Sequence, residues 1–400
     1  MQFKREIEGR IRAAAAHFPV VVVTGSRQTG KTTLLRHAFS GHRYVSLDLP
    51  SLAEQAERDP GRFLAEHGAP ALIDEVQYAP GMFRHLKQAV DRDRHRGGQF
   101  ILTGGQKFTL MREVSDSLAG RVALFELEPL SLAEIRGQAT TVDSELASTL
   151  ARGLYPELWR DPAISSRDFH SSYLATYLER DVRQILNVTS LRDFERFMRI
   201  LAARSGQLLN KSDIAKDVGV SPNAINDWIA VLQASNQIAL LEPYFQNIAK
   251  RSVKSPKVYF GDPGLLCHLL NLDAKTLLQS PYLGAVWETL LYAEMRKQIS
   301  AHALRCDVYY YRDQRAREVD FVLDSGGKLA FVEAKWAEHP DAADARTITA
   351  LDAELRASQL RVLPGKHAIL CRTPHPYPID ERTIALPHTH LHELLAPPSA

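Results

Sequence analysis

The sequence feature that most constrains this chain is a glycine-rich loop between a short apolar strand and a helical pattern. Residues 20–24 read Val-Val-Val-Val-Thr, a β-branched run that is typical of a buried parallel strand. The loop over residues 25–33 reads Gly-Ser-Arg-Gln-Thr-Gly-Lys-Thr-Thr, and a helical pattern follows it. This G-x-x-x-x-G-K-[ST] spacing, between a strand and a helix, predicts a loop that binds a polyphosphate.

Each residue type in this loop matches the chemistry of ATP with its magnesium ion. Gly25 and Gly30 permit sharp turns, so that successive backbone N–H groups converge on the phosphates. Lys31 is predicted to reach the β- and γ-phosphates, and the Thr32 hydroxyl to bind Mg²⁺. The predicted nucleotide contacts are Gly25, Ser26, Arg27, Gln28, Thr29, Gly30, Lys31, Thr32 and Thr33.

Two acids follow the apolar residues 71–73 and supply what a nucleotide hydrolase needs next. In a parallel sheet this strand end faces the phosphate loop, so Asp74 is predicted to hold the magnesium ion. Glu75 follows directly and is predicted to polarise the attacking water. Taken alone, two such acids can also cap the following helix.

Two further segments suggest contacts with the phosphates. Residues 100–106 form another buried strand with a polar end, where Thr103 or Gln106 is predicted to sense the γ-phosphate, unless this end is an ordinary turn. Arg121 follows Gly120 and precedes an apolar strand. An arginine given in cis or by a neighbouring subunit stabilises transition-state charge, whereas the alternative is a surface ion pair. Action in trans predicts a homo-oligomer.

The middle of the chain loses the alternation of strands and helices. Residues 165–205 read as helical, and residues 212–229 read as a helix-turn-helix with its turn at Gly219. The second helix would expose Asn223, Asn226 and Asp227, so both DNA contact and a packing or protein-contact role stay open. A basic patch that either faces phosphate or is merely solvated follows at Lys250, Arg251, Lys254 and Lys257.

The last segment predicts a β-hairpin with acids on one face. If residues 326 and 327 are the central turn residues, Asp320 lies directly opposite Glu333, close enough to share a metal ion. Lys335 projects from the same face and is predicted to stabilise an attacking hydroxide, while Glu288 on the preceding helix adds a carboxylate. The predicted centre is that of a metal-dependent phosphodiesterase, and the alternative is a solvated hairpin.

Composition limits the remaining possibilities. The 400 residues carry 49 Lys and Arg against 47 Asp and Glu, so any nucleic-acid surface must be a local patch. The three cysteines are far apart in the sequence, which argues against a disulfide scaffold and favours a cytoplasmic protein. No apolar run is long enough to predict a membrane span. The histidines at positions 388, 390 and 392 are expected to belong to a loosely ordered tail.

Over nearly its whole length the chain resembles the prokaryotic AAA-type ATPases whose C-terminal half is a domain of unknown function, number 4143. The matching segments are residues 25–35, 72–80, 102–104, 118–121, 128–134, 177–182, 254–265, 318–321 and 332–335. The resemblance implies an α/β fold: a parallel P-loop sheet with helices on both faces, a winged helix, and a domain similar to restriction endonucleases. The expected boundaries are 1–135 for the ATPase domain, 136–204 for a helical region, 205–247 for the winged helix and 248–400 for the nuclease-like domain.

Three functions remain open from the sequence. The first is ATP hydrolysis coupled to a C-terminal domain that interacts with DNA and cleaves it. The second is an ATP-gated module that binds DNA or a protein through a catalytically silent nuclease-like fold. The third is a signalling ATPase that senses something other than nucleic acid.

Overall fold

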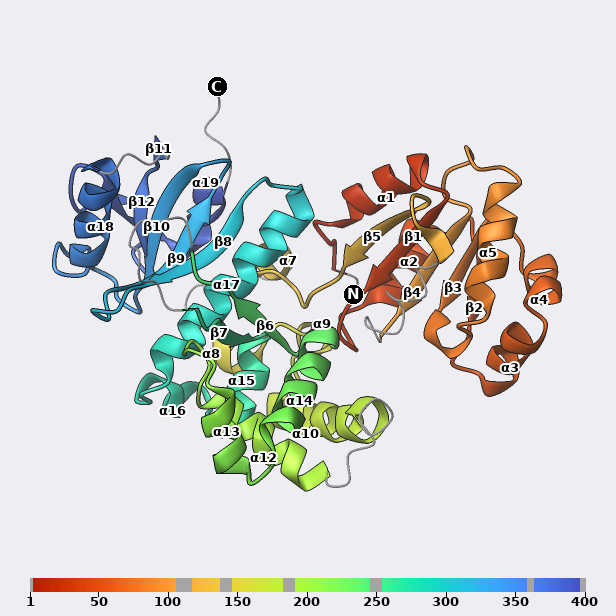
Figure 1. The fold of residues 1–400 in the computed structure, drawn as a ribbon, viewed down its shortest axis with the longest axis horizontal. Helices are drawn as coiled ribbons and strands as arrows, with labels where there is room; N and C mark the ends of the chain where they lie inside the picture. Colours follow the sequence, from red (N-terminus) through yellow and green to blue (C-terminus); the bar gives the residue numbers. More distant parts are fainter. Residues whose placement is uncertain are drawn as a thin grey trace. The chain divides into compact units, whose positions relative to one another are not determined.

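The computed structural model describes residues 3–105, 117–136, 146–182, 191–244, 254–357 and 363–395. Gln106, Lys250 and Arg251, for which a role was predicted, lie outside the described residues. The chain divides into two compact units, and each is considered by itself (Figure 1). Unit 1 comprises residues 1–138, 155–162 and 231–237, and unit 2 comprises the rest. The boundaries at 135, 204 and 247 stay predictions.

Unit 1 is built on a parallel sheet of five strands in the order β2-β3-β4-β1-β5. Its strands are β1 (Val20–Thr24), β2 (Arg43–Ser46), β3 (Ala71–Asp74), β4 (Phe100–Gly104) and β5 (Val122–Glu126). The β-branched run of β1 is fully buried between β4 and β5. Because all five strands run the same way, their carboxyl ends meet at one edge of the sheet.

Helices flank this sheet (Figure 1). They are α1 (Glu8–His17), α2 (Lys31–Ala38), α3 (Pro50–Arg58), α4 (Pro60–Glu66) and α5 (Met82–Asp91). Unit 1 also contains α7 (Leu132–Arg136), α9 (Pro156–Arg160) and a 3₁₀ turn at η1 (Val76–Tyr78). Helix α5 shows why they pack: it buries Met82, Phe83, Leu86 and Val90, which share one helical face, in the core below the sheet.

The helices of unit 2 come first in chain order. They are α8 (Leu146–Arg152), α10 (Ser166–Tyr177), the π-helical turn η2 (Leu178–Val182), α12 (Leu191–Ala202), α13 (Lys211–Val218), α14 (Pro222–Ala234, which continues into unit 1), α15 (Pro263–Leu269), α16 (Ala274–Leu278), α17 (Leu283–His302), α18 (Arg346–Ala357) and α19 (His392–Leu395). Helices α13 and α14 form at the predicted positions, with Gly219 in the left-handed conformation between them and the Ser221 hydroxyl accepting from Ala224 N at 3.2 Å.

A mixed sheet forms the C-terminal part of unit 2, in the order β13-β14-β12-β10-β9-β8. The strands are β8 (Asp307–Arg312), β9 (Glu318–Asp324), β10 (Lys328–Ala334), β11 (Leu363–Pro364), β12 (His367–Cys371), β13 (Tyr377–Pro378) and β14 (Thr383–Pro387), and a separate pair joins β6 (Ile238–Leu241) to β7 (Lys257–Phe260). This mixed sheet and the parallel sheet of unit 1 confirm the α/β fold class.

The hairpin of β9 and β10 has the predicted register. Val332 pairs with Phe321 and Leu329 with Asp324, which places Glu333 opposite Asp320. Gly326 and Gly327 have φ values of 67° and 87°, as a tight two-residue turn requires.

The expectation of a loosely ordered tail around the three histidines near the C-terminus is wrong. Residues 388–390 form a 3₁₀ turn, η3 (His388–His390), which is followed by α19 and by the buried Leu391 and Leu395. Among the described residues, no helix combines the length and the apolar character that a membrane crossing requires.

Candidate functional site

The phosphate-binding loop leaves the end of β1 and enters α2 through two glycines in conformations that other residues avoid. Gly25 has a φ of 145°, and a Cβ there would lie 2.1 Å from the carbonyl oxygen of Leu127. Gly30 has a φ of 89° and occupies the position directly before α2. Both glycines are therefore required by the backbone, as the motif predicts.

Lys31 lies buried inside the turn of this loop. Its Nζ donates to the carbonyl oxygens of Gly25 at 2.9 Å and Ser26 at 2.8 Å. The Thr29 hydroxyl donates to the same Ser26 carbonyl at 2.9 Å. These carbonyl oxygens hold the ammonium at the start of α2, where the motif places it for a phosphate.

The remaining loop residues differ in burial and backbone conformation. The Ser26 side chain is buried and donates to the backbone oxygen of Asn236 at 3.2 Å. Gln28 has a φ of 60°, and Thr33 is exposed on the first turn of α2. Arg27 is half-buried. Their contact with a nucleotide stays a prediction.

Asp74, at the end of β3, accepts hydrogen bonds from three hydroxyl groups. Thr32 donates to its Oδ2 at 2.8 Å, Tyr44 to the same oxygen at 3.1 Å, and Thr103 to its Oδ1 at 2.8 Å. These residues come from α2, β2 and β4, whose ends meet at this edge of the sheet. Burial and the Asp74 charge raise the pKa of Tyr44, so the phenol stays a neutral donor.

This arrangement fits a magnesium ion. Asp74 is 4% exposed, and the three hydroxyl groups that donate to it carry no charge, so the carboxylate remains attractive to a cation. The Thr32 hydroxyl and the Asp74 carboxylate are hard oxygen ligands of the kind that Mg²⁺ prefers. The predicted phosphate-sensing role of Thr103 is not what the geometry shows, because its fully buried hydroxyl orients Asp74 instead.

Glu75 follows Asp74 in a left-handed backbone conformation, with a φ of 56°. Its half-buried carboxylate accepts a hydrogen bond from the side-chain amide of Gln77. A carboxylate that is oriented by a neutral amide remains free to act as a base.

Arg121 lies at the wrong edge of the sheet to reach the loop of its own chain. It precedes β5, whose first residue Val122 pairs with Val20, whereas the phosphate loop follows Thr24 at the other end of β1. Its guanidinium forms a two-point ion pair with Asp91, at 2.6 and 3.1 Å. A role in cis is therefore excluded by the strand direction, and a role in trans stays a prediction.

Arg5 is a residue of this site that sequence reasoning missed. Its buried guanidinium donates to Glu134 Oε2 at 2.9 Å, to the Thr29 carbonyl at 2.8 Å and to the Glu128 carbonyl at 2.7 Å. It therefore ties the phosphate loop to the segment after β5. Its main partner is 129 residues away, so no local pattern could have found it.

In unit 2, the structure brings together the acids that the hairpin register predicts. Asp320 Oδ2 accepts from the backbone N–H of Ala334 at 2.9 Å, and Lys335 Nζ lies 3.3 Å from Glu333 Oε2. Burial raises the pKa of Glu333 to about 9, with a further contribution from the charge of Asp320. The predicted juxtaposition of Asp320, Glu333 and Lys335 is confirmed.

Lys257 is the residue of this cluster that was assigned wrongly. It was expected in a surface patch that either faces phosphate or is merely solvated, but it is 1% exposed. Its Nζ lies 2.5 Å from Glu318 Oε1, 3.7 Å from Asp320 Oδ1 and 3.9 Å from Glu288 Oε2. Although burial lowers it, these three charges raise the pKa of Lys257 above its usual range.

Glu288 completes the cluster from α17. The Tyr259 hydroxyl donates to its Oε2 at 3.0 Å, and burial, reinforced by Asp320, raises the pKa of Glu288 to about 8. Within the described residues, no group of three or more His, Cys, Asp or Glu is spaced to hold a metal ion. Because the Lys257 ammonium already lies among these carboxylates, their present arrangement does not fit a divalent ion, and the predicted metal remains untested.

The exposed face of α14 presents Asn223, Asn226 and Asp227, as predicted.

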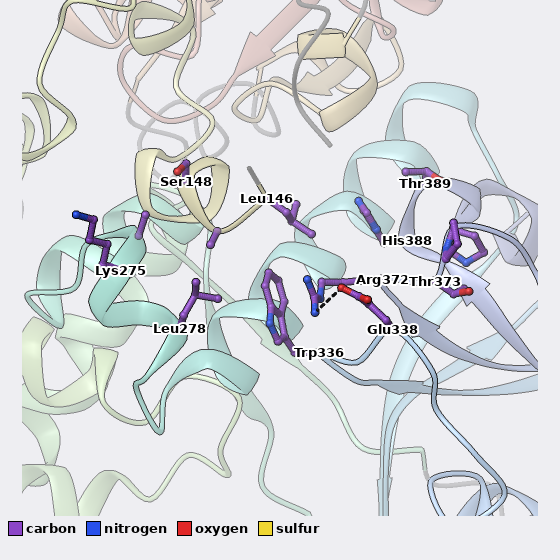
Figure 2. A pocket seen from close by; sticks show the side chains of 14 residues that line it. Leu146, Ser148, Lys275, Leu278, Trp336, Glu338, Arg372, Thr373, His388 and Thr389 are labelled. Carbon is purple, nitrogen blue, oxygen red and sulfur yellow. Dashed lines mark ion pairs between the residues drawn. The ribbon is translucent and has the colours of Figure 1, made fainter. Parts of the chain in front are cut away.

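Unit 2 also contains a pocket of about 690 Å³ beside the end of β10 (Figure 2). Arg372 lies over the ring of Trp336, 4.5 Å from its centroid, and forms an ion pair with Glu338 at 3.2 Å. Lys275 is exposed at the same pocket.

Comparison with known proteins settles the family. The chain is 30% identical over 387 residues to the uncharacterized protein Rv2008c of Mycobacterium tuberculosis and to its counterpart in Mycobacterium bovis, across 96% of this chain and 83% of each relative. Family models described as an AAA domain and as domain of unknown function DUF4143 match residues 17–136 and 283–391. The chain belongs to the AAA-type P-loop ATPases with a DUF4143 domain. A third model, domain of unknown function DUF8612, matches residues 143–276 of this ATPase.

Three solved structures have some similarity to this chain. The Walker-type ATPase PABY2304 of Pyrococcus abyssi is 15% identical with a TM-score of 0.45, covering 67% of this chain and 96% of its own. RuvB of Thermotoga maritima is 16% identical with a TM-score of 0.30, covering 59% and 89%. AMPPCP-bound DnaA from Aquifex aeolicus is 17% identical with a TM-score of 0.28, covering 57% and 86%.

Proposed function

We propose that unit 1 binds ATP with Mg²⁺ and hydrolyses it. The observation that supports this most directly is the contact between Thr32 and Asp74 at 2.8 Å, next to Lys31 at the start of α2. A loop that only recognises phosphate needs no carboxylate at this position, because a carboxylate repels phosphate unless a metal ion lies between them.

The residues of the site divide the work. The loop N–H groups and Lys31 bind the β- and γ-phosphates, and Thr32 and Asp74 hold the metal ion. Bound Mg²⁺ neutralises phosphate charge that develops as the bond to the γ-phosphate breaks. Glu75, oriented by Gln77, accepts the proton of the attacking water.

The test is a phosphate-release assay on the full chain with Mg²⁺ and ATP. Glu75→Gln is expected to keep ATP affinity and to lose at least about 100-fold in turnover, because only the proton acceptor is removed. Glu54→Gln, which changes an exposed glutamate of α3, is the matched control. Full turnover by Glu75→Gln would refute this role, and no turnover by the wild type would refute hydrolysis.

The proposal includes a homo-oligomer in which Arg121 serves a neighbouring protomer. It is supported by the position of Arg121, which is exposed enough to exchange Asp91 for a phosphate and is too far from its own loop to act in cis. Turnover per chain should then rise with protein concentration in the wild type and stay low in Arg121→Lys, which keeps the charge. Turnover that is independent of both would contradict this arrangement.

For unit 2 we propose contact with DNA without cleavage. The supporting observation is the pairing of an aromatic ring with a cation in the pocket of Figure 2. Unpaired bases stack on tryptophan and arginine planes, and Lys275 and Arg372 are placed for phosphate. The face of α14 suits DNA less well, because Asp227 repels phosphate and no lysine or arginine lies on that helix.

The test is the fluorescence anisotropy of labelled single-stranded DNA with the full chain. Trp336→Leu and Arg372→Ala are each expected to weaken binding about tenfold, because stacking on one base is worth ~1–3 kcal/mol. Arg199→Ala is the matched control, since Arg199 is also an arginine of unit 2 paired with a glutamate. Unchanged affinity in both pocket variants would overturn the proposal, and shortening of the DNA in Mn²⁺ would show cleavage instead.

A further inference from the structure

The acidic cluster of unit 2 already contains a cation, supplied by the chain itself. Lys257 is the first residue of β7, and its side chain is 2% exposed. The three carboxylates around its Nζ come from two other elements, Glu288 from α17 and Glu318 and Asp320 from β9. Carboxylates on separate elements that converge on one buried point require positive charge there.

Several neighbouring groups fix the position of the Lys257 ammonium. Glu318 binds it at 2.5 Å while its other oxygen is held by Arg312 at 2.8 Å. The ring of Tyr310 lies 5.6 Å from the same Nζ. A long, flexible side chain that is held by ion pairs and an aromatic face has little freedom to leave.

The carboxylates are also held by neighbours that keep them around the lysine. Asp320 uses one oxygen for Lys257 and the other for the backbone N–H of Ala334. The Glu288 oxygen that faces Lys257 also accepts from Tyr259. A divalent ion needs several oxygens at ~2.0–2.6 Å, so it would have to displace the ammonium and re-aim these oxygens.

We propose that Lys257 is the resident cation of this acidic cluster and that it excludes divalent metal ions from unit 2. The ammonium takes the electrostatic role that a metal would otherwise have. The cluster then joins β7, α17 and β9 as a structural centre. This inference does not depend on ATP hydrolysis, because it concerns groups of unit 2 alone.

The test is a Mn²⁺ titration of the nucleotide-free full chain, with free Mn²⁺ measured by electron paramagnetic resonance. The wild type and Asp320→Asn are expected to bind Mn²⁺ equally, since Asp320 holds a lysine and not a metal ion. Lys257→Met should gain one Mn²⁺ per chain, at least about tenfold tighter than any site of the wild type. Adding Asp320→Asn to Lys257→Met should remove that gain.

Lys297→Met is the matched control, because Lys297 is a buried lysine of α17 that pairs with Glu294 at 3.0 Å. It should gain no Mn²⁺. The proposal is overturned if wild-type Mn²⁺ binding is lost in Asp320→Asn, or if folded Lys257→Met gains no ion. If Lys257→Met fails to fold, the comparison of the wild type with Asp320→Asn still tests the proposal: equal Mn²⁺ binding supports it, and a loss of binding in Asp320→Asn overturns it. A thermal unfolding midpoint that Mn²⁺ raises in the wild type but not in Asp320→Asn would also overturn it.

Discussion

The two units of this ATPase each contain a buried lysine, and they surround it with different groups. In unit 1, Lys31 donates to two backbone carbonyls, and Asp74 is held by hydroxyl groups. In unit 2, Lys257 lies directly among Glu288, Glu318 and Asp320. The first arrangement holds Asp74 with neutral hydroxyl groups, which orient it for a cation, whereas the second pairs the lysine with carboxylates of its own chain.

The role of a charged group therefore depends more on its partners than on its burial. Hydroxyl and carbonyl partners orient a charge without cancelling it, so a phosphate or a magnesium ion still gains from binding. An ammonium among carboxylates removes that gain, and the same groups then hold the fold together. Removing each lysine should therefore affect different properties.

The largest expected effect is on the stability of unit 2. Lys257→Met should lower the free energy of unfolding by about 3–5 kcal/mol, because it leaves buried carboxylates without their counter-charge. Urea unfolding measures this loss. Adding Glu318→Gln should recover part of it, since Glu318 is the nearest partner. A Lys257→Met protein as stable as the wild type would contradict the structural role of Lys257.

The next largest effect is on nucleotide binding by unit 1. Lys31→Ala should weaken ATP binding about 100-fold, or about 3 kcal/mol, because the phosphates lose their ammonium. Its unfolding free energy should change little, since the carbonyls of Gly25 and Ser26 lose only one donor. Calorimetry with Mg²⁺-ATP measures the affinity, and Lys87→Ala on the exposed face of α5 is the control. Unweakened binding would remove Lys31 from the site.

A smaller effect should follow from loosening Asp74. Thr103→Val removes one of its hydroxyl donors and should raise the Mg²⁺ concentration needed for half-maximal turnover about fivefold, since a buried hydrogen bond is worth about 1 kcal/mol. Thr103→Ser should restore the wild-type value. If Thr103→Val instead changes only the ATP affinity, Thr103 contacts the nucleotide as first expected.

The smallest expected effect is on the stability of unit 2 at acidic pH. Burial lowers the pKa of His268 to about 4, helped by His170 and Arg199. The folded state thus favours neutral His268, so its contribution to stability is present above pH 6.5 and is lost as the pH falls toward 4. His268→Gln should flatten the decline of the unfolding midpoint in that range. An unchanged slope would mean that His268 does not contribute to it.

Much of unit 1 could be predicted from sequence, because its signals are local. The phosphate loop, β1, β3, β4 and β5 each follow from a short apolar run and the residues after it. Strand β2 was missed because Arg43 and Tyr44 are exposed at the sheet edge, which weakens the apolar pattern. Tyr44 consequently went unnoticed as a partner of Asp74.

In unit 2 as well, features with local signals could be predicted and features that depend on distant contacts could not. The hairpin register could be predicted because two turn glycines fix which residues of β9 and β10 face each other. The role of Lys257 could not, because it depends on how β7 lies against α17 and β9, and no local pattern carries that arrangement. Strands β12 and β14, which pair in parallel with distant partners, were missed for the same reason.

The most direct test of the contrast between the units is the number of metal ions that the full chain binds with ATP. Mn²⁺ is titrated in the presence of a non-hydrolysable ATP analogue, and bound ions are counted by electron paramagnetic resonance. We expect one Mn²⁺ per chain, which is lost in Asp74→Asn and retained in Asp320→Asn. Two ions per chain, one of them lost in Asp320→Asn, would contradict the assignment of Lys257 as the cation of unit 2.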